Sequence, residues 1–241
     1  MIGLQLYTVR TLTGDEEGAR KTVRALKQMG YECVQLAGGI EDVERTANAC
    51  LSEGMPVIGI LTDMDICEQY TQRLFDIAKA CGAKDLGISA FTTTDEQTVQ
   101  LLDRANAFNA LAQANGFTFS YHNHSLEFIR CASGKRVIDY VCENFEGDLM
   151  PDTYWLQHGG ADVRDFISSH GERVKILHLK DMKREKEGVT FAEIGNGNIN
   201  FAGVIECAKK KGIDVFIVEQ DESEDALVSA KISIDNLRKL I

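Results

Sequence analysis

Two histidines and a glutamate lie close together in the stretch FSYHNHSLEF, residues 119–128. His122 and His124 are separated by one residue, and Glu127 follows three residues after the second histidine. Imidazole is a common ligand of divalent metal ions, and because it titrates near neutral pH it also serves as a general acid or base. Three interpretations are therefore open: a metal ligand, an acid/base group, or a histidine that only ends a strand.

A β-strand through this stretch would sort its side chains onto two sides, because alternate residues point in opposite directions. Ser120, His122 and, if the strand continues, His124 would share one side. Tyr121 and Asn123 would face the other side. Both imidazoles could then face one site, although a hydrogen bond from His124 to a loop carbonyl is a competing interpretation.

The elements that must position these residues are short apolar runs, each followed by a helical pattern. The runs cover residues 2–6, 33–37, 56–62, 85–89, 117–122, 148–152, 174–179 and 215–220. Alternating strands and helices predict a parallel sheet. Eight repeats with nothing left over favour a single-domain α/β protein, a (β/α)8 TIM barrel over residues 1–241, rather than an open doubly wound sheet. The sixth run is the weakest strand, since Pro151 interrupts it.

Composition excludes several classes of function. With 37 acidic and 26 basic residues the net charge is −11, which disfavours nucleic acids and anionic membranes as partners. The seven cysteines are odd in number and lack C-x-x-C spacing, which is typical of a reducing compartment. No segment approaches the roughly 18 apolar residues of a membrane span. A soluble cytoplasmic protein is expected.

The barrel prediction locates the site, because such barrels carry it at the carboxyl ends of their strands. The polar residues at or near these ends are Gln5, Gln35, Thr62, Ser89, His122, Asp152, His178 and Glu219. The last four come from consecutive strands and are all potential metal ligands. Carboxylates with imidazoles suit one divalent ion, Mn²⁺, Zn²⁺, Co²⁺ or Mg²⁺, with open positions for substrate oxygens. The alternative is that each of these side chains simply meets solvent.

Several motifs, in order along the whole chain, resemble the xylose isomerase-like TIM barrels, the sugar phosphate isomerase/epimerase group. The motifs are LQLYTVR, GYECVQLAG, YHNHSLEF, DTYWLQHGGAD, HLKDM, EIGNGNINF and VEQD. The superfamily also includes inosose dehydratases, ketose 3-epimerases, lyases acting on 3-oxo-glycosides and the endonuclease IV branch. The resemblance therefore implies the fold more firmly than the substrate.

The resemblance implies that Asp152, His178 and Glu219 bind the metal ion. Epimerases of the group carry a glutamate at the end of the fifth strand, where this chain has His122 and the nearest carboxylate is Glu127. The preference of hard ions for oxygen favours Glu127 as the fourth ligand, whereas strand geometry favours His122. The implied catalytic bases are Glu219 and either Glu127 or His122.

Three further residues are candidates for binding substrate. His124 could face the sugar, Trp155 could form an apolar wall for its ring, and Lys180 could bind a sugar oxygen or a phosphate. The competing interpretations are a loop hydrogen bond, plain core and an exposed loop charge. Residues 194–201 lack the phosphate-loop pattern, so a turn or lid leading into the next helix is expected there. Gln35 stands at a position in the second strand where relatives commonly carry a glutamate. A substrate-binding carboxylate is therefore not expected at this position.

The expected function is a metal-dependent isomerase or epimerase of a sugar, sugar phosphate or cyclitol. A base would remove the proton next to a carbonyl, and the divalent ion would stabilise the enediolate. The first alternative is a dehydratase or lyase on an inosose or 3-oxo-glycoside, favoured if His122 is the base. The second is a non-catalytic sugar-binding barrel. An endonuclease of the multi-metal type would need more histidines and a basic groove. A homodimer is a further expectation, since relatives commonly dimerise.

Overall fold

The computed structural model describes residues 1–241, and its centre is a sheet of eight parallel strands curved into a nearly closed barrel. The strands are β1 (Ile2–Gln5), β2 (Cys33–Ala37), β3 (Val57–Thr62), β4 (Asp85–Ser89), β5 (Thr118–His122), β6 (Asp148–Met150), β7 (Leu177–Leu179) and β10 (Phe216–Val218). Their order is β6-β5-β4-β3-β2-β1-β10-β7. Single bridges from Leu149 to Val174 and from Asp152 to His178 link the two ends of the sheet. The predicted (β/α)8 barrel is confirmed.

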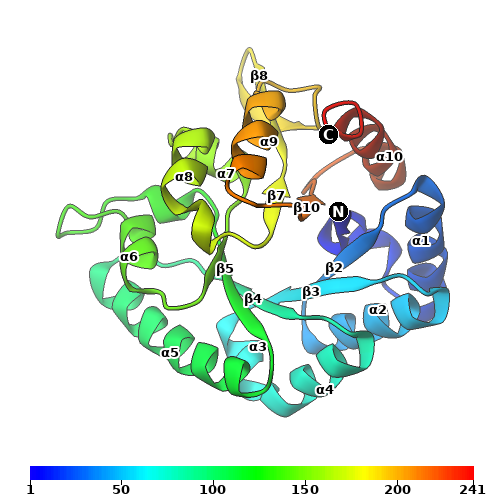
Figure 1. Ribbon diagram of the computed structural model, residues 1–241, viewed down its shortest axis with the longest axis horizontal. Coiled ribbons are helices and arrows are strands. Elements are labelled where there is room, and N and C mark those ends of the chain that lie inside the picture. The colour runs from blue at the N-terminus through cyan, green and yellow to red at the C-terminus, as the bar shows by residue number, and fades with distance from the viewer.

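Helices form an outer ring around the strands, as Figure 1 shows. They are α1 (Glu16–Met29), α2 (Ile40–Glu53), α3 (Met64–Gln69), α4 (Thr71–Cys81), α5 (Asp95–Ala114), α6 (Val137–Asn144), α7 (Thr153–His158), α8 (Val163–His170), α9 (Phe201–Lys210) and α10 (Ala226–Leu237). Short 3₁₀ helices cover Leu6–Leu12, Leu126–Phe128 and Gly171–Arg173. No helix combines the length and apolar character needed to cross a membrane.

The sequence signals at the helix ends explain where these helices begin and stop. The Asp15 carboxylate accepts a hydrogen bond from the Gly18 amide and so caps the first turn of α1. Gly30 and Gly54 end α1 and α2 with φ values of 92° and 62°, a left-handed conformation that glycine adopts at little cost. At each of these glycines the chain leaves the helix and turns toward the start of the next strand.

The barrel interior is packed with apolar side chains below the carboxyl ends of the strands. Gly3 on β1 makes room for this packing, since a Cβ there would lie 2.5 Å from the Ile217 side chain and 2.6 Å from that of Cys33. Cys33 and Ile217 join Met150 and Ile176 in one buried cluster. Above it, the layer at the carboxyl ends of the strands is polar, and this layer holds the candidate site.

The structure departs from the predicted elements in the loops. The helical pattern after β3 divides into α3 and α4, and the segment after β7 forms an antiparallel hairpin of β8 (Asp181–Glu185) and β9 (Gly188–Ala192). This hairpin projects from the rim of the barrel in Figure 1. Its exposed, charged strand carries no apolar alternation, so periodicity could not reveal it. The sixth strand ends at Met150, before Pro151, rather than at position 152.

Candidate metal centre and active site

Four side chains predicted from the strand ends come together in the structure. His122, Asp152, His178 and Glu219 each direct one nitrogen or oxygen into a group whose atoms all lie within 4.8 Å of one another. His122 ends β5, His178 lies within β7, and the other two follow β6 and β10. All four are buried. Neighbouring parallel strands thus deliver a buried set of two imidazoles and two carboxylates to one edge of the barrel.

His178 is held by partners at both ring nitrogens. Its Nδ1 lies 2.6 Å from Glu219 Oε2, and its Nε2 lies 2.7 Å from Gln35 Oε1. The Gln35 amide is oriented because Gln5 Nε2 donates to its oxygen at 2.8 Å and its own nitrogen faces Met150 Sδ at 3.3 Å. Nε2 therefore carries a hydrogen and donates it to Gln35, the kind of support that orients a metal-binding histidine. Nδ1 is then the ring nitrogen that faces the Glu219 carboxylate.

Lys180 is a fully buried cation beside this cluster. Its Nζ lies 2.8 Å from Asp221 Oδ1, 3.3 Å from Asp152 Oδ2 and 3.6 Å from Glu219 Oε1. Burial alone would lower the pKa of this ammonium, but the three carboxylates outweigh burial and raise it. Three carboxylates and one ammonium leave two negative charges, which one divalent cation would balance.

The unpaired atoms of the cluster also suit a divalent ion. His122 Nδ1 is buried and has no hydrogen-bond partner. Asp152 Oδ2 has none either and forms an ion pair with Lys180, while Asp152 Oδ1 caps α7 at the Trp155 amide. Burial, with His178 adding to it, lowers the pKa of His122 well below its usual range, so the ring is neutral. Burial raises the pKa of Asp152 to about 6, partly offset by Lys180. Neutral imidazoles and ionised carboxylates are the forms that bind metals, at about 2.0–2.2 Å. The four residues fit such an ion.

Glu127 is not one of the four residues that the structure groups together. Its carboxylate accepts hydrogen bonds from the His124 amide at 2.9 Å and from the Tyr121 hydroxyl at 3.3 Å. Tyr121 points to the opposite side of β5 from His122, as strand alternation predicts. Of the two candidates for the fourth ligand, His122 lies within the group, and Glu127 hydrogen-bonds the loop that carries His124. The chemical role of each residue stays a prediction.

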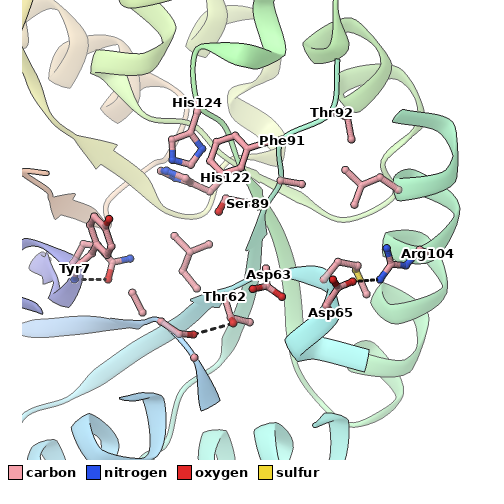
Figure 2. Close-up of a pocket in the computed structure, with 18 of the residues that line it drawn as sticks. Tyr7, Thr62, Asp63, Asp65, Ser89, Phe91, Thr92, Arg104, His122 and His124 are labelled. Atoms are coloured by element: carbon pink, nitrogen blue, oxygen red, sulfur yellow. Dashed lines mark hydrogen bonds and ion pairs between the residues drawn. The ribbon is translucent and has the colours of Figure 1, made fainter. Parts of the chain in front are cut away.

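A cavity of about 910 Å³ opens beside the cluster. His122, His124 and Glu219 line one end of it, and Figure 2 shows the two imidazoles side by side there. The His124 ring lies 4.9 Å from the Phe91 ring and 5.4 Å from the Trp155 ring. Burial lowers the pKa of His124 to about 4, so this ring is neutral at neutral pH.

Of the three predicted substrate-binding residues, only His124 lines the cavity. Trp155 packs behind His124, and the Lys180 Nζ lies 5.1 Å from the centre of its ring. Sequence reasoning missed Asp221, which lines the cavity and pairs with Lys180. Its position two residues after Glu219 was the available signal, because alternate residues at a strand end can face the same side. No comparable sequence pattern identifies Phe91, which lies in the loop after β4, as a lining residue.

The glycine-containing stretch 194–201 forms a turn that leads into α9, as predicted. Asp181 holds this turn, since its buried carboxylate accepts hydrogen bonds from four backbone amides. The donors are Met182, Gly195, Gly197 and Ile199. Because Asp181 already occupies these N–H groups, they are not available to a phosphate.

Comparison with known proteins places the chain in a family. Residues 23–240 match the family described as xylose isomerase-like TIM barrel. The chain belongs to this family. The resemblance inferred from the motifs is thereby confirmed.

Individual relatives are distant. The chain is 23% identical over 155 residues to an inosose dehydratase of Clostridium perfringens, a match that covers 58% of this chain and 52% of that protein. The chain thus spans about half the length of the curated relatives it matches. A sugar phosphate isomerase/epimerase of Parabacteroides distasonis superposes with a TM-score of 0.77 at 22% identity, over 99% of this chain and 97% of the other. A D-allulose 3-epimerase of Methylomonas sp., in complex with D-allulose, superposes with a TM-score of 0.77 at 13% identity, over 100% of this chain and 96% of the other. These structures show the shared fold.

Proposed function

We propose that this protein is a metal-dependent isomerase or epimerase of a carbohydrate. The observation that carries the proposal is the buried cluster of His122, Asp152, His178 and Glu219, which opens onto a large cavity. A divalent ion held by these residues would polarise a substrate carbonyl and acidify the neighbouring C–H bond. The names of the two structural relatives, an isomerase/epimerase and a ketose epimerase, support this class of reaction.

Glu219 is the residue best suited to remove the proton. Burial alone would raise the pKa of its carboxyl, but Lys180 and the hydrogen bond with His178 hold that pKa well below its usual range. The carboxylate is therefore ionised, and it lines the cavity. A base must start unprotonated and lie within reach of the substrate, and Glu219 meets both conditions.

His122 enters the same end of the cavity from another strand, β5. Its neutral imidazole could serve as a metal ligand or as a second group that accepts and returns a proton. Asp152 and Lys180 do not line the cavity. Their proposed task is to complete the metal site and to keep the neighbouring carboxylates in place.

A dehydratase acting on an inosose is the second candidate. The imidazole of His122 stands where epimerases of the group carry a carboxylate, and His124 lies beside it with a ring-to-ring distance of 5.0 Å. A neutral imidazole can accept a proton and return it to a departing hydroxyl, as loss of water requires. The name of the Clostridium perfringens relative supports this alternative.

Hydrogen exchange into solvent tests the proposal independently of the natural substrate. The Mn²⁺-loaded protein would be incubated in D₂O with D-allulose, D-fructose and an inosose, and deuterium next to the carbonyl measured by NMR. We expect exchange with at least one of these compounds, its loss in Glu219→Gln, and its retention in Glu222→Gln, which changes an exposed neighbour. Accumulation of a dehydrated product would favour the dehydratase. Full exchange in Glu219→Gln would contradict the assignment of the base.

A further inference from the structure

The cavity extends well beyond the metal cluster. From His122 and Glu219 it runs over the ends of β3 and β4 toward Asp65 on α3 and Arg104 on α5. Figure 2 shows this course, with Thr62 and Asp63 lying between Tyr7 and the Asp65–Arg104 pair. Its volume of about 910 Å³ is near the upper end of the ~300–1,000 Å³ typical of pockets for drug-sized ligands. One sugar ring at the cluster would leave the outer part of the cavity unfilled.

We infer that the site binds an unphosphorylated disaccharide, whose second ring lies in the outer part of the cavity. This inference rests on the proposed function, because the first ring is the one that reacts beside Glu219. It adds a second sugar subsite, formed by the loops after β3 and β4, and it excludes a phosphate from the preferred substrate.

The charges around the cavity disfavour a phosphate. Arg104 is the single lysine or arginine among the lining residues. It is already paired with two carboxylates, at 2.5 Å from Asp65 and 2.7 Å from Glu68. Four carboxylates line the cavity, those of Asp63, Asp65, Glu219 and Asp221.

Four carboxylates and one guanidinium sum to three negative charges, and a bound divalent ion would still leave one. A phosphate dianion entering this space would meet net repulsion with no free cation to pair with. The amides of Gly195, Gly197 and Ile199 in the turn at 194–201 offer no substitute, because they already donate to Asp181.

The same lining suits a neutral sugar ring. Its uncharged polar groups include Thr62, Ser89, Gln97 and Gln100, and together with the carboxylates they can exchange hydrogen bonds with several hydroxyls. Phe91 adds an aromatic face that is 65% exposed and lies 4.9 Å from the His124 ring. An exposed aromatic next to the reacting end is positioned to pack against the apolar face of a second ring.

Binding measurements on the Mn²⁺-loaded protein test this subsite. Calorimetric titrations would compare D-glucose, D-glucose 6-phosphate, cellobiose, maltose and trehalose. We expect at least one disaccharide to bind about ten-fold more tightly than glucose, and glucose 6-phosphate to bind no more tightly than glucose. Phe91→Ala should abolish the advantage of the disaccharide over glucose. Leu111→Ala, which removes an exposed apolar side chain from α5 outside the cavity, is the matched control.

The inference is overturned if glucose 6-phosphate binds most tightly, if no disaccharide exceeds glucose, or if Phe91→Ala leaves disaccharide affinity intact. Metal content and deuterium exchange of the same samples separate this failure from that of the proposed function. Protein that binds Mn²⁺ and exchanges protons, yet shows no preference for a disaccharide, refutes only the second subsite. Protein without metal or exchange refutes the proposed function itself.

Discussion

Replacing Lys180 with methionine probes the charge balance on which the metal site depends. The ammonium lies within 3.6 Å of carboxylate oxygens of three residues, and it is fully buried. Methionine has a similar length and keeps the packing, so the change removes mainly the charge. Removing one partner of a buried ion pair costs roughly 3–5 kcal/mol, because the remaining charges lose their compensation. We expect the metal-free variant to lose a free energy of unfolding of this order.

The variant should also respond to metal differently from the unmodified protein. A divalent ion would supply the positive charge that the carboxylates lack, so Mn²⁺ should restore more stability to Lys180→Met than it adds to the unmodified chain. Urea denaturation with chelator and with saturating Mn²⁺, followed by the fluorescence of Trp155, measures both values. Lys183→Met is the matched control, because Lys183 is half-exposed and pairs only with Glu185. A loss below about 1 kcal/mol is expected for it.

Two results would refute this reasoning. If Lys180→Met costs no more than the surface control, the ammonium does not compensate the carboxylates. If the loss is the same with and without Mn²⁺, no ion binds where its charge can replace that of Lys180.

Three other predictions follow from contacts around the site and the barrel. Gln35→Leu removes the acceptor of His178 Nε2 and should weaken Mn²⁺ binding by about 10- to 100-fold in titrations with a competing chelator; unchanged affinity would mean that Gln35 does not orient the ligand. Burial raises the pKa of Asp85 from 3.8 to about 7, so the folded state favours the protonated acid. Asp85 therefore contributes fully to the free energy of unfolding below its unfolded pKa. This contribution, up to about 4 kcal/mol, is lost as the pH rises through about 7. In metal-free denaturation between pH 4 and 8, the free energy of unfolding of Asp85→Asn should fall less with rising pH than that of the unmodified protein. The same pH dependence in both proteins would contradict the raised pKa of Asp85. Glu127→Gln should keep its metal, because the Glu127 carboxylate contacts Tyr121 and the His124 amide rather than the cluster. Loss of metal from that variant would indicate that Glu127 is a metal ligand.

The strand framework could be predicted from the sequence because it depends on local patterns. The pattern predicts the fifth strand over residues 117–122, and the strand lies at Thr118–His122. Strand alternation separates His122 from Tyr121. Once the eight strands form a barrel, their carboxyl ends must share one edge, so Asp152, His178 and Glu219 could be grouped without coordinates. Periodicity and topology together were enough for this part of the site.

The remaining parts depend on contacts between distant segments. The position of Glu127 is set by the hydroxyl of Tyr121 and by a loop amide, which no periodic pattern encodes. Lys180 follows a buried strand, but its burial depends on Asp221, 41 residues later. The role proposed for Phe91 depends on the cavity, which residues from several loops line. Such features follow from the packed structure rather than from local preference.

Metal content is the measurement that tests the central claim most directly. Protein purified without chelator, alongside its His122→Ala and Glu127→Ala variants, would be analysed by mass spectrometry for Mn, Co, Zn and Mg. The account predicts nearly one divalent ion per chain in the unmodified protein and in Glu127→Ala, and a clear loss in His122→Ala. No bound metal, even after soaking with Mn²⁺, Co²⁺ and Zn²⁺, would contradict it. Loss of metal in Glu127→Ala alone would contradict the ligand set that the structure brings together.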